Sequence, residues 1–193
     1  MSLLARLRRR FTPAPEPVRA VVKASSDPDE RVLAVGTLLP DGWLVATSRG
    51  LRVVPADLDL AQADAVPVLR WHEVGRASWK SAGTDGGSLT VVPLTEVEPG
   101  VQARLPAVRY RLDQVGELPA VLRRRVDQTV VASQRHPLPT GGAVLVVARR
   151  VPGQEAREWT VVFDDDADRT DPVAREAARE RLASAIEAED PTR

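Results

Sequence analysis

Short runs of β-forming residues, each ended by a turn signal, occupy most of this chain. Residues 31–39, 43–47 and 51–54 are rich in Val, Leu and Ala, and Pro-Asp-Gly and Ser-Arg-Gly triplets separate them. Strands of this length between tight turns are typical of an antiparallel meander. The sequence therefore predicts an α+β fold dominated by antiparallel strands, arranged as a sandwich or a partly open barrel.

The same pattern continues toward the C-terminus. Further strands are predicted at 66–71, 74–80, 88–94, 108–112, 130–133, 143–148 and 159–163. Glycine-rich segments at 83–87 and 140–142 lie between them. Neither has the spacing of a phosphate-binding loop, so both are interpreted as hairpin turns.

Two segments have apolar residues at helical spacing. In residues 117–129, Leu118 and Leu122 lie one turn apart, and a proline occupies the first turn, which helices tolerate. In residues 171–189, an aspartate at the N-cap position precedes an apolar stripe that ends at Ile186. Both segments are predicted to be helices that bury one face.

Composition excludes several classes of function. The chain has no cysteine, which rules out disulfides, thiol nucleophiles and zinc–thiolate sites. Its 27 basic and 27 acidic residues cancel, which argues against a nucleic-acid partner because such proteins carry excess positive charge. No apolar run reaches the roughly 18 residues of a spanning helix. Hydrophobic residues make up 43%, enough to build a core.

Charge is uneven along the chain. Residues 1–23 hold six basic residues and one acid, whereas residues 155–193 hold six basic residues and 12 acids. Within the first segment, Leu and Phe recur at helical spacing and the basic side chains lie mostly opposite them; these are Arg6, Arg8, Arg9 and Arg10. Three hypotheses stay open for this arm: a solvated terminus, an amphipathic anchor on anionic lipid, or a nucleic-acid-binding arm.

The strand and turn pattern resembles bacterial pleckstrin-homology-like (PH-like) domains. The resemblance rests on VLAVGTLLPDGWLVATSRGLRVVP, on VPVLRWHEVGRASW and SLTVVPL, and on a last hairpin followed by one amphipathic helix. It covers about residues 30–94 and 143–189. It implies a partly open barrel capped by the C-terminal helix. The composition, rich in Arg, Ala, Val and Pro, further suggests an actinobacterial protein. It also implies a non-catalytic binding or scaffolding module.

The resemblance suggests a division of the chain. Residues 1–29 are expected to be a flexible basic arm and proline-rich linker, and residues 30–189 a single PH-like domain. Within that domain, residues 95–142 depart from the family pattern and are expected to be a helical insertion. Residues 171–189 are expected to be the capping helix.

No arrangement of residues indicates catalysis, a cofactor or a metal. The carboxylates of 164–168 match three positions of a calcium loop, but Arg169 and Arg175 stand where that loop needs Gly and Glu. The two histidines have no neighbouring base or orienting group at a suitable spacing. No catalytic, cofactor-binding or metal-binding residue is therefore assigned.

Exposed arginines are the remaining candidates for binding. Arg6, Arg8, Arg9 and Arg10 are candidates for contact with an anionic surface, and Arg123 and Arg124 for contact with a partner. We expect a non-catalytic binding or adaptor module whose partner is a protein or an anionic lipid surface. Its expected location is the cytoplasm, peripheral on the inner face of the membrane. The alternatives are a nucleic-acid-associated factor that uses the arm and a small enzyme without a recognisable motif.

Overall fold

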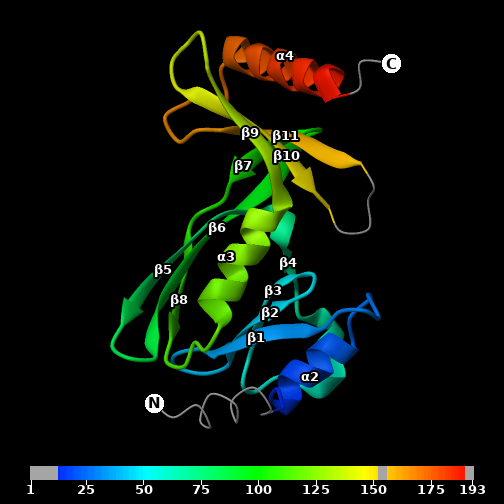
Figure 1. The fold of residues 1–193 in the computed structure, drawn as a ribbon, viewed down its shortest axis with the longest axis vertical. Coiled ribbons are helices and arrows are strands. Elements are labelled where there is room, and N and C mark those ends of the chain that lie inside the picture. The colour runs from blue at the N-terminus through cyan, green and yellow to red at the C-terminus, as the bar shows by residue number, and fades with distance from the viewer. Residues whose placement is uncertain (1–12, 152–155, 190–193) are drawn as a thin grey trace.

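The structure, a computed structural model, describes residues 13–151 and 156–189. Helices and strands alternate irregularly along the chain (Figure 1). They are α2 (Glu16–Lys23), β1 (Val32–Thr37), β2 (Trp43–Thr47), β3 (Gly50–Val54), β4 (Leu69–Arg70), β5 (Val74–Ala82), β6 (Gly86–Glu98), β7 (Val101–Arg104), β8 (Val108–Leu112), α3 (Leu118–Thr129), β9 (Val130–Pro137), β10 (Ala143–Arg150), β11 (Arg157–Phe163) and α4 (Pro172–Glu189). Short 3₁₀ helices at Leu60–Ala65 and Trp71–Glu73 flank β4.

The strands form two sheets in an α+β architecture. β1 to β4 make an antiparallel sheet, and the remaining strands make a curled, half-barrel sheet in the order β5-β6-β7-β11-β10-β9, with β8 also paired to β6. The 13-residue strand β6 links the two ends of the molecule, because its first part pairs with β5 and β8 and its last part with β7. Figure 1 shows β6 running from the lower half toward β7 and the upper half.

The main core lies between the antiparallel sheet and the β5-β6-β8 part of the curled sheet. Leu44, Leu51, Leu89 and Leu112 are buried there, and α3 adds Leu118. At one corner the sheets meet, since Leu38 forms a bridge with Leu112. Alternation explains this packing, because every second residue of each strand points to the same side.

The fold is mainly antiparallel, as predicted, but the curled sheet is mixed and not purely antiparallel. β11 runs parallel to β7, with Val161 opposite Val101 and Val162 opposite Gln102. Between them the chain forms β8, α3, β9 and β10 before it returns. Hydrophobic alternation identifies a strand and its buried face but does not encode the direction of its neighbour.

The helix that covers the main core is α3, and this corrects the expected role of the C-terminal helix. Leu118 and Leu122 of α3 are buried in the main core. α4 instead packs Ala174 and Ala178 against a separate cluster on β7, β10 and β11 that includes Phe163. An apolar stripe predicts that a helix buries one face, but not which sheet it covers.

Residues 13–29 are not simply a linker. Residues Glu16–Lys23 form α2, whose Val18 and Val21 are buried against the second face of the antiparallel sheet, beside Val45 and Val54. A proline in the first turn is compatible with a helix, so the proline-rich stretch starts α2 instead of extending as a spacer. The basic residues of the expected arm at 6–10 lie outside the described part of the chain.

The segment 95–142, expected as an insertion, supplies integral elements. Its strand β8 pairs with β6 on the wall of the main core, and its helix α3 covers that core. β7 and β9 belong to the curled sheet. Three of the four, β8, α3 and the first half of β9, coincide with predicted segments, whereas β7 has no clear sequence signal.

Candidate anion-binding surface

Four basic side chains lie on the outer side of the β5-β6-β8 sheet, and we call them the cationic face: Arg76, Lys80, Arg109 and Arg111. Lys80 and Arg111 flank Ser88 of β6 in one row of the ladder, and Arg109 lies opposite Thr90 in the next row. All four basic residues are exposed. Strands pair about 5 Å apart, so the basic residues on either side of β6 lie within about 10 Å of each other along a row.

Burial of the opposite side chains holds the cationic face outward. Trp79 of β5, Leu89 and Val91 of β6, and Tyr110 of β8 pack into or against the main core. Because neighbouring strand residues point to opposite sides, the basic residues between them must point to solvent. Turning them inward would bury charge without a partner, which is strongly unfavourable.

The cationic face has no internal neutralisation within the described residues. β5, β8 and residues 86–95 of β6 contain no Asp or Glu, and no ion pair within residues 13–151 and 156–189 involves any of its four cations. Arg109 donates a hydrogen bond from Nη2 to Ser88 Oγ over 3.1 Å. Serine and threonine hydroxyls between the cations provide further donors for an anion. The surface therefore has the chemistry to hold carboxylate or phosphate groups.

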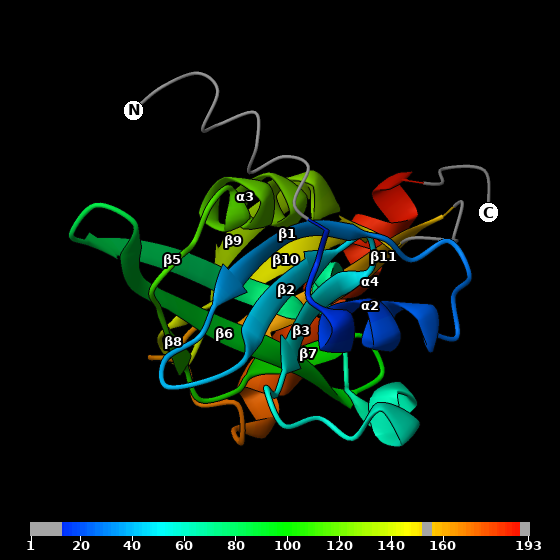
Figure 2. The ribbon, with the colours of Figure 1, turned by 90° about the horizontal axis from the view of Figure 1, so that it is seen from below.

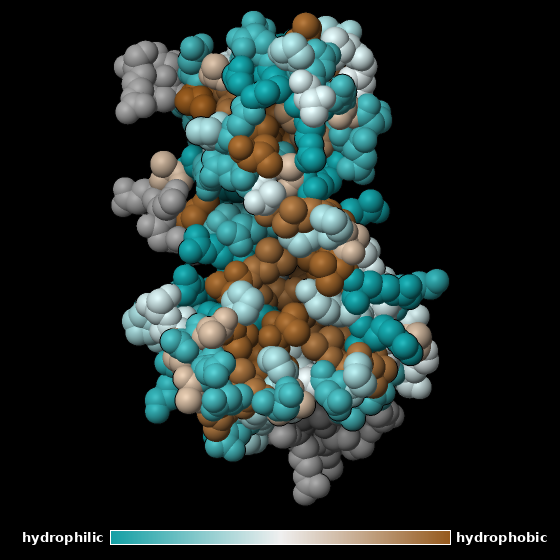
Figure 3. Space-filling model, turned by 180° about the vertical axis from the view of Figure 1, so that it is seen from behind, coloured by the Kyte–Doolittle hydropathy of each residue, from teal (hydrophilic) through white to brown (hydrophobic). Residues whose placement is uncertain are grey.

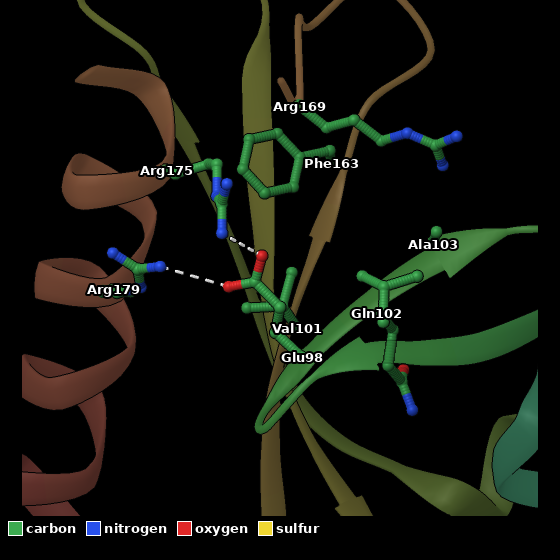
Figure 4. A pocket seen from close by; sticks show the side chains of 9 residues that line it. Glu98, Val101, Gln102, Ala103, Phe163, Arg169, Arg175 and Arg179 are labelled. Atoms are coloured by element: carbon green, nitrogen blue, oxygen red, sulfur yellow. Dashed lines mark hydrogen bonds and ion pairs between the residues drawn. The ribbon is translucent and has the colours of Figure 1, made fainter. Parts of the chain in front are cut away.

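A second arginine cluster lines a cavity of about 40 Å³ between the β6–β7 hairpin and α4 (Figure 4). There Glu98 accepts hydrogen bonds from Arg175 and, over 3.1 Å, from Nη2 of Arg179. Arg169 points away from this carboxylate in Figure 4. The cavity is only large enough for a few waters. Because two guanidinium groups already share Glu98, this cluster attaches α4 to the hairpin and is not our candidate binding site.

The most strongly shifted carboxyl group also has a structural role. Glu30 is buried and accepts hydrogen bonds from Arg52 Nε over 2.9 Å and from Arg52 Nη2 over 2.8 Å. Burial alone would raise its pKa, but the hydrogen bonds from Arg52 and Ser25 and the charge of Arg52 outweigh burial and lower the pKa to about 2. Arg52 also donates to the carbonyl of Val66. This pair ties the segment after α2 to β3.

Two further buried polar groups lie where α3 meets the curled sheet. Arg149 donates a hydrogen bond from Nη1 to Thr129 Oγ1 at the end of α3, over 3.2 Å, where a cation favours a helix C-terminus. Burial lowers the pKa of Arg149, and burial likewise lowers the pKa of His72, which favours the neutral imidazole. Within the described residues, no group of three or more His, Asp or Glu is placed to hold a metal. We assign Arg149 to the joint between α3 and β10.

The arginines that the sequence analysis named as candidates for binding lie partly in the described structure and partly outside it. Arg123 and Arg124 are exposed on α3, and within the described residues Arg123 forms an exposed ion pair with Asp127 at 3.7 Å. The acidic segment that follows β11 pairs with other arginines, since Asp164 contacts Arg104 and Arg135. Arg6, Arg8, Arg9 and Arg10 lie outside the described residues, so their role stays a prediction.

Sequence reasoning missed the cationic face because its residues come from two strands about thirty positions apart. Each strand carries a weak signal, since Arg and Lys alternate with core residues in RASWK and VRYRL. A search for basic residues at every second position, in strands without acids, would have found both halves. Only the pairing of both strands with β6 brings them together.

Comparisons with known proteins give no assignment. No protein-family model matches the chain, and neither a search of curated proteins nor one of solved structures found a match. None of the helices in the described ranges combines the length and apolar character needed to cross a bilayer. The functional conclusion therefore rests on the geometry of the molecule itself.

Proposed function

We propose that this protein is a non-catalytic binding module that holds an acidic segment of a partner protein on the cationic face. The observation that carries the proposal is the arrangement of four exposed cations, with interleaved hydroxyl groups, on one acid-free stretch of sheet. Opposite charge across an interface speeds association and disfavours wrong partners. A cytoplasmic, membrane-peripheral location is part of the proposal.

The proposed architecture of this module is a PH-like barrel in which α3 is the covering helix. An antiparallel sheet of four strands, the β5-β6-β8 part of the curled sheet that faces it, and one helix over the core support this proposal. Under this proposal the strands β9 to β11 and α4 are an addition to the barrel. Such a barrel serves as a scaffold, and function has to be argued from its surface.

Reversing charge on the cationic face is the direct test of this function. Arg109→Glu combined with Arg111→Glu is expected to weaken binding of a labelled oligoglutamate peptide about tenfold or more at low ionic strength, since two attractions become repulsions. Fluorescence anisotropy measures this binding. Raising the salt concentration should weaken peptide binding by the unaltered protein toward the level of the variant, because exposed charges are screened.

The matched control is Arg123→Glu combined with Arg124→Glu on α3, which changes the net charge equally at another exposed place. Unchanged peptide binding by this control supports the cationic face. An equal loss in both variants would mean that only overall charge matters, and a loss confined to the control would move the partner site to α3. Either result would contradict the proposal.

The basic arm supports a second candidate function, attachment to an anionic membrane. Arg6, Arg8, Arg9 and Arg10 accompany Leu and Phe residues in a segment of net positive charge. Basic residues near an anionic surface contribute roughly 1 kcal/mol each, and apolar side chains add to membrane affinity by insertion.

Co-flotation with vesicles tests this second function. Vesicles with about one third phosphatidylserine should retain the full chain, and changing all four arginines to glutamine should lower bound protein at least tenfold. Vesicles of phosphatidylcholine alone are the control for charge. Equal flotation of the protein and its variant would show that the arm is not a membrane anchor.

A further inference from the structure

The first part of β8, around Arg109, has an unpaired edge next to the cationic face. On one side β8 pairs with β6, with Leu89 opposite Tyr110 and Thr90 opposite Arg109. On its other side, the carbonyl of Arg111 accepts a hydrogen bond from the backbone amide of Leu39. Backbone groups two residues apart in a strand have the same direction, so those of Arg109 also point away from β6. Among the described residues no strand pairs with β8 at that position.

Apolar surface lies beside this edge. Val108 is on the same side of β8 as Tyr110 and Leu112, which pack in the main core, yet it is 40% exposed. Val53 of β3 shares its side with the buried Leu51 and is 39% exposed. Each valine therefore continues the core-facing row of its strand out to solvent. In Figure 2, β3 and β8 both lie away from α3, on the other side of the molecule. Figure 3 shows hydrophobic side chains gathered between hydrophilic ones on the face of the molecule opposite to the view of Figure 1.

The side chains of β8 alternate in a way that specifies a complementary strand. Arg109 and Arg111 point to the cationic face, whereas Val108 and Tyr110 point to the core. A strand that paired with this edge would place every second side chain beside a cation and the others beside apolar surface. Its matching sequence alternates acidic and apolar residues.

We propose that the partner's acidic segment binds as an added strand at the free edge of β8 beside Arg109, with acidic side chains toward the cationic face and apolar side chains toward Val108. This inference rests on the proposed function and names the form of its ligand. The backbone N–H of Arg109 donates to the added strand and its carbonyl accepts. Main-chain hydrogen bonds then contribute affinity, and the alternating side chains provide specificity.

Two labelled octapeptides of the same composition test the inference with the full chain. One alternates glutamate with valine or threonine, and the other carries all its glutamates first. Strand addition predicts at least tenfold tighter binding of the alternating peptide, measured by fluorescence anisotropy. Equal binding of both peptides would overturn strand addition while leaving an electrostatic partner site in place. If neither peptide binds, the proposed function is overturned as well.

A pair of variants isolates the backbone contribution. Arg109→Ala removes the charge, and Arg109→Pro removes both the charge and the outward N–H, which an edge strand tolerates. The alternating peptide should bind the proline variant at least threefold more weakly than the alanine variant, and the two should have the same thermal unfolding midpoint. Equal peptide binding by these variants would overturn the added strand. A dimer of the free protein that the alternating peptide does not dissociate would assign the edge to a second copy and overturn the proposal.

Discussion

Glu30→Gln is expected to lower the free energy of unfolding by about 3 kcal/mol, because it leaves the guanidinium of Arg52 buried without a counter-charge. The two side chains are 0% and 6% exposed and joined by two hydrogen bonds. Glutamine keeps the shape of the side chain, so the loss reports charge and hydrogen bonding and not a cavity. Urea unfolding followed by tryptophan fluorescence measures the change, because Trp43 and Trp71 pack in the clusters on the two faces of the antiparallel sheet.

Asp127→Asn is the matched control for this variant. It removes an ion pair on α3 whose side chains are 86% and 70% exposed, and exposed helix pairs contribute only about 0.5 kcal/mol. Replacing Glu30 and Arg52 together by apolar residues should restore part of the lost stability, since no unpaired charge remains. Equal effects of Glu30→Gln and Asp127→Asn would contradict the structural role of the buried pair.

The pH dependence of stability should change in the same variant. The pKa of Glu30 lies at about 2 in the folded protein, below its ordinary value of 4.5. Ionised Glu30 therefore stabilises the folded state fully above about pH 4.5, and this contribution is lost as the pH falls from 4.5 toward 2. The unfolding midpoint of the unaltered protein should fall faster than that of Glu30→Gln across this range. Parallel curves would exclude a lowered pKa.

Leu118→Ala is expected to lower the free energy of unfolding by about 3 kcal/mol, through lost burial and the cavity that remains. Leu118 is 0% exposed in the main core and lies against Gly36 of β1, where an added Cβ would be 2.8 Å from Leu118 Cδ2. Thermal and urea unfolding measure the change. Binding of a hydrophobic dye should also increase where the loss of packing exposes the core.

Leu182→Ala on α4 is the comparison for this second variant. Leu182 is only partly buried beside the separate cluster of α4, so its truncation should cost about 1 kcal/mol. The difference between the two variants in the free energy of unfolding tests which helix covers the main core. A larger loss for Leu182→Ala than for Leu118→Ala would contradict the assignment of α3 to that position.

The candidate site was only partly predictable from the sequence. Arg123 and Arg124 were identified because consecutive basic residues are conspicuous, and the structure shows them exposed on α3 without bringing them into a larger surface. The four residues of the cationic face were not identified as a group. Their proximity depends on the pairing of β5 and β8 with β6, which is a contact between distant segments.

Local chemistry in the sequence determined the elements themselves. Turn residues and β-branched runs located β2, β3 and β8 to within a residue, and four-residue spacing located α3 and α4. These features depend on backbone preferences and on which side chains must leave water together. They are therefore encoded over a few neighbouring residues.

Only the tertiary structure decided how those elements combine. It placed β11 parallel to β7, set α3 instead of α4 over the main core, and buried Val18 of a segment that was expected to be a linker. An apolar face indicates that it will be buried. It does not indicate against which other face, because many apolar faces of this chain have similar residues. The shapes of these faces and the connections of the whole chain determine which of them pack together. They thereby also determine which basic side chains lie on one surface.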